Sequence, residues 1–140
     1  MSVVECELIR VILSETQSHQ TIVLKEKGGE RTMRVAIGPA EAVAIHRAIT
    51  GERLPRPMTH ELLGLVLEAL NTRVVRVVIN DLRNGTFFGR LILQQDGRTL
   101  DVDSRPSDAV ALAMQKGAPI FVEDAVLAQA ADDYHASDDY

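Results

Sequence analysis

Five side chains that could bind a cation or a phosphate group fall in one short stretch, residues 101–108. Asp101 and Asp103 are two positions apart on an expected strand, so their side chains point to one face. Asp108 falls in the first turn of the helix expected next, where the helix dipole favours an anion. Three carboxylates at such a junction could bind a hard divalent cation such as Mg²⁺ or Mn²⁺. Arg105 could contact a phosphate bidentately, and Ser107 could add a hydrogen bond.

The same stretch also has a purely structural interpretation. Asp103, Ser104, Ser107 and Asp108 are common helix-capping types. Asp101 and Arg105 could simply form a surface ion pair. The sequence leaves both interpretations open.

A second polar cluster follows the apolar run Val74–Ile79. Asn80 and Asp81 stand where this expected strand runs into its turn, and a carboxylate there could act as a ligand or a base. The alternative is an Asx-type turn ahead of Asn84-Gly85. Neither interpretation is favoured by the sequence.

A third cluster, His60 and Glu61, begins a helix for which Thr59 is the expected N-cap. His60 could act as a general base or as a hydrogen-bond donor to phosphate. The alternative is an ordinary surface histidine. Arg90, on the expected strand 86–95, could reach the same face as Arg105. The apolar stripe of the helix after Thr59 consists of Leu62, Leu63, Val66, Leu67 and Leu70.

Composition limits the classes of protein that fit. The chain has 140 residues and a formal net charge of −5, which suits one domain. Residues 131–140 hold four aspartates and no lysine or arginine, which predicts a disordered acidic tail. The rest has sixteen acidic and fifteen basic side chains, so it lacks the basic character of a protein that holds nucleic acid by bulk charge.

Several kinds of site and location are excluded by what the sequence lacks. No apolar run approaches the ~20 residues that cross a bilayer, and the N-terminus has no basic region typical of a secretory signal. The single cysteine, Cys6, excludes an internal disulfide and a cysteine-based zinc cluster. We therefore expect a cytoplasmic protein without a membrane partner. The glycine-rich phosphate-binding motifs and the GxSxG motif are absent, so no nucleotide cofactor is expected.

An internal repeat relates the two halves of the chain. Segments 31–44 and 98–111 align without a gap and are identical at seven of fourteen positions. Each copy predicts three strands followed by two helices, so we expect one α+β domain with antiparallel or mixed sheets and packed helices over residues 1–130. The halves of this duplicated β-β-β-α-α unit are about 1–70 and 71–130. Only the second copy carries Asp101, Asp103, Arg105 and Ser107, where the first has Arg34, Ala36, Gly38 and Ala40.

Three strings of residues, 56–62, 78–90 and 102–111, resemble the bifunctional nuclease domain family. The strings are RPMTHEL, VINDLRNGTFFGR and VDSRPSDAVA, and the resemblance extends from about Val3 to Ala130. It implies a duplicated, self-associating domain, as a homodimer or another homo-oligomer, with DNase and RNase activity. DNA, RNA or both are then the expected substrates.

These observations combine into one catalytic hypothesis. Asp81 and Asp103, with Asp108, would hold Mg²⁺ or Mn²⁺ and activate water against a phosphodiester. Arg90 and Arg105 would stabilise the phosphate, and His60 would transfer a proton. Further substrate contacts would come from Asn80, Ser107 and Arg56. The alternative is a non-catalytic protein- or ligand-binding module that self-associates.

Overall fold

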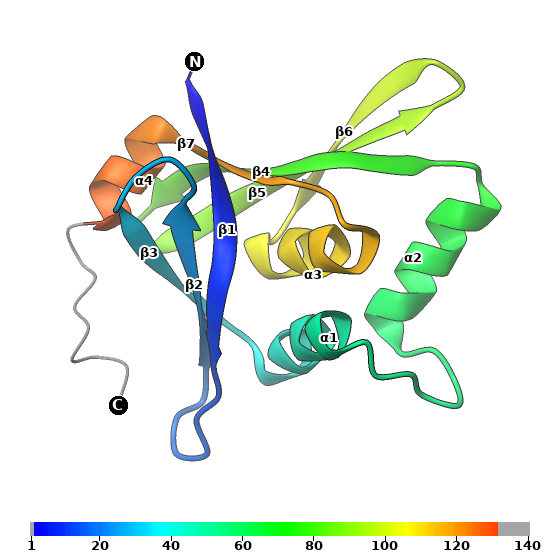
Figure 1. The fold of residues 1–140 in the computed structure, drawn as a ribbon, viewed down its shortest axis with the longest axis horizontal. Helices are drawn as coiled ribbons and strands as arrows, with labels where there is room; N and C mark the ends of the chain where they lie inside the picture. The colour runs from blue at the N-terminus through cyan, green and yellow to red at the C-terminus, as the bar shows by residue number, and fades with distance from the viewer. Residues whose placement is uncertain (1, 132–140) are drawn as a thin grey trace.

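A computed structural model describes residues 2–131 of the chain. The predicted acidic tail beyond Ala131 lies outside the described residues. The described elements, in chain order, are β1 (Val3–Ile12), β2 (Gln20–Glu26), β3 (Thr32–Ile37), α1 (Pro39–Thr50), α2 (Thr59–Ala69), β4 (Arg73–Arg83), β5 (Thr86–Gln95), β6 (Arg98–Ser104), α3 (Pro106–Lys116), β7 (Ile120–Glu123) and α4 (Asp124–Ala131) (Figure 1).

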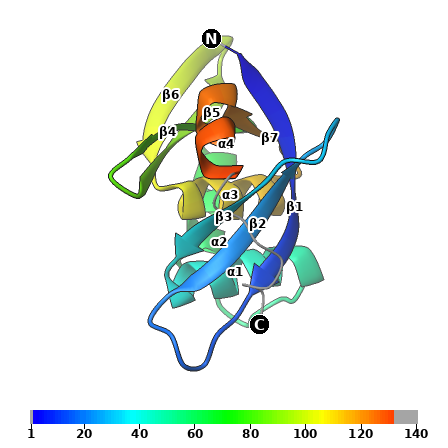
Figure 2. The same ribbon diagram turned by 90° about the vertical axis from the view of Figure 1, so that its left-hand side faces the viewer.

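All seven described strands form one sheet in the order β3-β2-β1-β7-β4-β5-β6. The β4–β7 pair is parallel and the other neighbouring pairs are antiparallel, which confirms the α+β prediction with a mixed sheet. The short strand β7 therefore joins β1 to β4 at the centre, and Figure 2 shows it beside β1. One hydrophobic core contains residues of this sheet and of all four helices.

Local sequence explains most element boundaries. Asn84-Gly85 and Asp96-Gly97 have positive φ at both positions, the backbone of a two-residue hairpin turn that follows the strand twist. Prolines occupy the first position of α1 and of α3, and both helices end at a left-handed glycine, Gly51 and Gly117.

The strand order sets β1–β3 and β4–β6 on opposite sides of β7, with β1 and β4 innermost. Each set leads into a helix that starts at a proline, and α1 packs against α3. This arrangement is what a duplicated unit would produce. The duplication itself remains a prediction from the repeated sequence.

Three local expectations were wrong. Strand β4 continues past Ile79 to Arg83, so Asn80 and Asp81 lie inside a strand, beside an irregularity in its pairing with β5, and not in a turn. Helix α2 begins at Thr59 with Met58 as its N-cap, and Thr59 itself is not the cap. The expected apolar stripe of α2 is also mostly exposed, because the helix turns His60, Gly64 and Leu67 inward.

Among residues 2–131, no helix is long and apolar enough to cross a membrane. The single cysteine is buried on β1. Burial, above all, raises the pKa of the Cys6 thiol to about 11, so it stays protonated at neutral pH and is a poor nucleophile.

Gly89 on β5 offers a test of the packing at the β6–α3 junction. An added Cβ would lie 3.2 Å from the Ser104 carbonyl oxygen and 3.3 Å from the Pro106 nitrogen, both backbone atoms. We expect Gly89→Ala to lower the free energy of unfolding by about 1–3 kcal/mol, measured in urea. Gly28→Ala is the matched control, because no atom lies within 4 Å of its added Cβ. Equal effects of the two changes would contradict the packing described here.

Candidate active site at the start of helix α3

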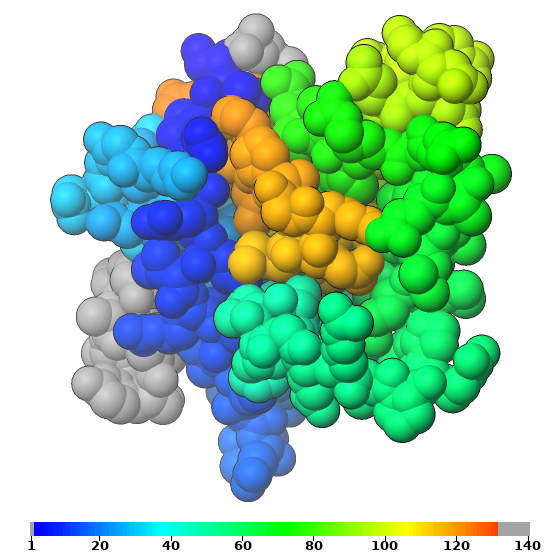
Figure 3. Space-filling view, turned by 45° about the vertical axis from the view of Figure 1, so that its right-hand side comes forward, coloured from blue at the N-terminus to red at the C-terminus, as the bar shows by residue number. Residues whose placement is uncertain are grey.

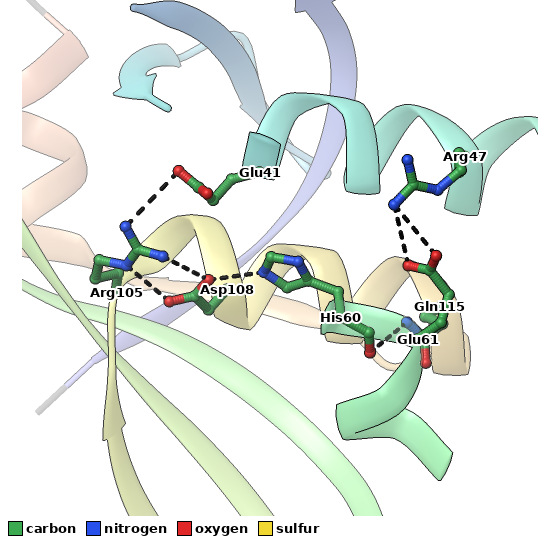
Figure 4. A network of polar contacts seen from close by, with 7 residues as sticks. All are labelled: Glu41, Arg47, His60, Glu61, Arg105, Asp108 and Gln115. Atoms are coloured by element: carbon green, nitrogen blue, oxygen red, sulfur yellow. Dashed lines mark hydrogen bonds and ion pairs between the residues drawn. The ribbon is translucent and has the colours of Figure 1, made fainter. Parts of the chain in front are cut away.

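The starts of α2 and α3 bring His60, Arg105 and Asp108 together (Figure 4). Arg105 is the N-cap residue of α3, Asp108 lies in its first turn, and His60 is the second residue of α2. The Gln115 side-chain amide, farther along α3, donates a hydrogen bond of 3.1 Å to the His60 carbonyl oxygen. Helix α3 therefore fixes both the backbone and the side chain of His60.

Asp108 is the shared acceptor of this cluster. Its Oδ1 lies 2.8 Å from His60 Nε2, and Arg105 donates to Oδ2 at 2.8 Å and to Oδ1 at 3.0 Å. Burial raises the pKa of the Asp108 carboxyl, but the hydrogen bonds from Arg105 and His60 outweigh burial, and the pKa lies below its ordinary value. Asp108 is therefore a carboxylate at neutral pH.

The imidazole of His60 is buried and held by one nitrogen. Its Nε2 is engaged by Asp108, whereas its Nδ1 has no hydrogen-bond partner among residues 2–131. A histidine oriented by a carboxylate through one nitrogen keeps the other nitrogen available to accept or donate a proton. This is the arrangement that acid–base chemistry needs.

Arg105 extends the cluster to helix α1. Its guanidinium is mainly exposed and lies 3.7 Å from Glu41 Oε1. The hydrogen bond to Asp108 is the main reason that the pKa of Arg105 is raised, so its charge is permanent. A guanidinium has five N–H donors, and Asp108 occupies two of them. Donors therefore remain for an oxyanion.

The cluster opens into a cavity of about 510 Å³, here called the His60 cavity. Besides Glu41, His60, Arg105 and Asp108, its walls include Met58, Leu63 and Val43. A second ion pair, Arg47 with Glu61 at 3.2 Å, lies beside it, and Arg47 also lines the cavity (Figure 4). A volume of this size is ordinary for a small-molecule site.

The other predicted catalytic residues are held in separate groups. Asp81 pairs with Arg83 Nε at 2.6 Å, and this hydrogen bond lowers the pKa of Asp81. On the β5–β6 hairpin, which projects from the body in Figure 3, Arg90 lies 2.8 Å from Asp101 and 3.4 Å from Asp103. Asp101 therefore pairs with Arg90, and the surface pair between Asp101 and Arg105 given above as an alternative is not formed.

The predicted metal ligands do not gather. Asp81, Asp103 and Asp108 are each paired with a different arginine. In the described part of the chain, no group of three or more His, Cys, Asp or Glu side chains is placed to hold a metal ion. These residues do not fit a single Mg²⁺ or Mn²⁺ centre.

The three predicted substrate contacts also lie apart. Arg56 is exposed in the connection between α1 and α2. The side-chain oxygen of Asn80 is buried and has no hydrogen-bond partner within the described residues. Ser107 is buried and lines a second cavity, which also includes Arg105.

Sequence reasoning missed Glu41, Arg47 and Gln115 as members of the site. A signal for Glu41 was present, because it occupies the position equivalent to Asp108 in the internal repeat. Glu41 and Asp108 both approach Arg105, so equivalent acids from the two copies meet at one guanidinium. Arg47 and Gln115 carry no comparable signal.

The fold and the cluster define an α+β domain with a histidine–aspartate–arginine site at the starts of two helices. The model of the bifunctional nuclease domain matches residues 22–135, so the chain belongs to the bifunctional nuclease domain family.

Two kinds of relative are similar to the chain. An uncharacterized protein of Mycobacterium tuberculosis strain H37Rv is 40% identical over 126 residues, which is 90% of this chain and 75% of the relative. Bifunctional nuclease 1 of Oryza sativa subsp. japonica is 27% identical over 114 residues, which is 79% of this chain but only 34% of the rice protein. A nuclease of Oryza minuta, named bifunctional nuclease, matches to the same extent.

Asp108→Asn tests the charge of the shared acceptor. At pH 7 we expect the free energy of unfolding to fall by about 1–3 kcal/mol, because two donors lose a charged acceptor. The folded-state pKa of Asp108 is lowered, so its contribution is present above the unfolded value of about 3.9 and is lost as the pH falls through the folded value. The difference from the wild type, measured by urea unfolding at pH 7 and at an acidic pH below the unfolded value, should therefore be smaller at the acidic pH.

Asp103→Asn is the control, because that side chain is 77% exposed. Its unfolding curve should match the wild-type curve at both pH values. A constant effect of Asp108→Asn at both pH values would show that the charge of Asp108 is not what stabilises the cluster.

Proposed function

We propose that this protein is a nuclease that hydrolyses phosphodiester bonds of DNA, RNA or both at the His60 cavity. Family membership supports the reaction class. The observation that carries the choice of site is the 2.8 Å contact between His60 Nε2 and Asp108, with Arg105 on the same carboxylate. Of the predicted catalytic residues, only His60 and Arg105 share one cavity.

His60 is the proton-transfer group of the proposed reaction. Its Nδ1 takes a proton from the attacking oxygen, which is water for either substrate or the ribose 2′-hydroxyl for RNA. As the new bond to phosphorus forms, the bond to the leaving ester oxygen breaks, and the imidazolium returns its proton to that oxygen. Attack by the 2′-hydroxyl leaves a 2′,3′-cyclic phosphate, which water then opens to complete hydrolysis. Asp108 holds the ring in place and stabilises the imidazolium that forms, the role of a carboxylate behind a catalytic histidine. Asp108 acts through His60 and is a positioning residue.

Arg105 stabilises the negative charge that grows on the phosphate oxygens during attack. Its free N–H donors supply this contact while Asp108 keeps the guanidinium in position. No step is assigned to a metal ion, because the predicted carboxylate ligands are separated.

Exposed arginines near the cavity supply a path for a polynucleotide. Arg53 and Arg56 lie in the connection 51–58, and neither forms an ion pair with a described residue. Met58, at the end of this connection, lines the His60 cavity. The connection also contains Glu52, so its net charge is +1. Arg56 is the arginine nearer in sequence to Met58 and is proposed to contact the substrate backbone.

His60→Ala tests the proton-transfer role. We expect the initial rate of cleavage of single-stranded DNA and RNA oligonucleotides to fall by about 10²-fold or more. Added imidazole should restore part of the rate, because the variant leaves space where the ring was. His46→Ala, on the exposed side of α1, is the matched control and should cleave like the wild type.

Equal rates for His60→Ala and the wild type would remove His60 from the mechanism. A folded wild-type protein that binds oligonucleotides without cleaving them would favour the alternative function, a non-catalytic binding module. A thermal unfolding scan of His60→Ala shows whether a lost rate comes from a lost fold, and imidazole rescue would contradict a purely structural role.

We further propose that two copies associate through α2. Its outer surface carries Leu62, Leu65, Val66 and Leu70, each 43–56% exposed. The two acidic residues of α2 are already neutralised within the chain, Glu61 by Arg47 and Glu68 by Lys116. Two such surfaces can therefore meet without opposing like charges, which suits a self-complementary interface.

Leu65→Glu tests this interface by placing equal charges opposite each other across a two-fold axis. Size-exclusion chromatography with light scattering should show a homo-oligomer for the wild type and a monomer for the variant. Val102→Glu is the control, because Val102 is similarly exposed but lies on β6. A monomeric wild type would contradict the proposal.

A further inference from the structure

A second and larger cavity, of about 620 Å³, lies on the other side of Arg105. We call it the Ser107 cavity. It lies between strand β3, the β4–β5 hairpin and the starting residues of α3, and Ala130 of α4 closes part of it. Arg105 lines both cavities, so the two spaces are neighbours across one guanidinium. The volume of the Ser107 cavity is in the range of sites that bind a small organic ligand.

One end of the Ser107 cavity has unused hydrogen-bond donors. The first backbone bond at the start of α3 runs from the Ala109 N–H to the Arg105 carbonyl oxygen, so the N–H groups of Ser107 and Asp108 precede the helical ladder. Ser107 is only 5% exposed, and its hydroxyl has no hydrogen-bond partner within residues 2–131. Ser107 lines the cavity, so a ligand there can supply the hydrogen-bond partner that this hydroxyl lacks within the protein.

The charged groups in the cavity wall favour a ligand of negative charge. Arg105 contributes a guanidinium with N–H donors beyond the two that Asp108 accepts, and His19 contributes an imidazole. None of the described residues that line this cavity is acidic, in a chain whose net charge is −5. The His60 cavity, by contrast, contains Glu41 and Asp108. An anion is therefore favoured in the Ser107 cavity, at the positive end of α3.

The remaining wall is apolar and includes an aromatic ring. Phe87 and Leu82 come from the hairpin, Val35 and Ile37 from β3, and Ala130 from α4. A bare phosphate would leave this wall uncovered. A ligand that joins an anionic group to a flat, largely apolar ring would contact both the hydrogen-bond donors and the apolar wall of the cavity. A nucleotide has this composition.

We propose that the Ser107 cavity binds one unpaired nucleotide, with its phosphate at Ser107, Arg105 and the start of α3 and its base against Phe87. The inference rests on the proposed nuclease function and deepens it, because it names single-stranded nucleic acid as the substrate class. A base in a duplex remains stacked and paired, so it reaches such a cavity only when it is unpaired. The shared Arg105 brings the nucleotide's phosphate next to His60.

The test is binding of ribonucleoside 5′-monophosphates to the full chain, by calorimetry and by amide chemical-shift changes. Inorganic phosphate and free nucleosides are the comparison ligands. We expect at least one monophosphate to bind more tightly than either comparison ligand, with shifts at Phe87 and Ser107. Ser107→Ala should weaken this binding about fivefold to tenfold, because one hydrogen bond is lost. Ser2→Ala, at an exposed position, should leave it unchanged.

Three results would overturn the inference: no saturable binding of any monophosphate, equal affinity for inorganic phosphate and monophosphates, or unchanged affinity in Ser107→Ala. Tighter binding of a duplex than of its separated strands would overturn the single-strand assignment. The assays are repeated in His60→Ala, which lacks the proposed proton-transfer group. Nucleotide binding without cleavage by the wild type would contradict the proposed function alone, whereas cleavage without nucleotide binding would contradict this inference alone.

Discussion

The carboxylate of Asp108 connects three helices of this protein. It accepts hydrogen bonds from His60 on α2 and from Arg105 at the start of α3, and Arg105 in turn approaches Glu41 on α1. Asp108, His60 and Glu41 are partly or wholly buried, whereas Arg105 is mainly exposed. The three buried groups depend on their partners to offset lost hydration. Together with the Gln115 hydrogen bond to the His60 carbonyl, this shared acceptor holds the start of α2 on α3 and so helps to shape the His60 cavity.

Arginine placement explains why the predicted carboxylate centre does not form. Asp81 forms an ion pair with Arg83, two residues away on its own strand. Asp103 forms one with Arg90, which lies directly opposite it in the pairing of β5 with β6. Each pair is made by neighbours in one strand or hairpin, so little chain entropy opposes it. Three carboxylates that look like a set in the sequence therefore belong to three separate pairs.

The sequence predicted local structure well and distant contacts poorly. Proline, glycine and the Asn-Gly and Asp-Gly turns marked α1, α3 and the hairpins, because these residues act through their own backbone preferences. The sequence motifs that contain His60 and Arg105 were recognised. The contact between these two parts of the chain depends on how α2 packs on α3, which local sequence does not encode. The same packing exposes Leu62 and Leu70 and buries Gly64, whose added Cβ would collide with the Gln115 side chain.

The place of β7 in the sheet affects how the chain can fold. This four-residue strand is the last one of the described chain, yet it is the one that bonds to both β1 and β4. During synthesis, β1–β3 and β4–β6 can form hairpins from local contacts, but the continuous sheet must wait until residues 120–123 emerge. The final assembly step then closes contacts across more than a hundred residues, from Val3 to Glu123. Such long-range closure is slow, so the unjoined edges of β1 and β4 are exposed until it is complete.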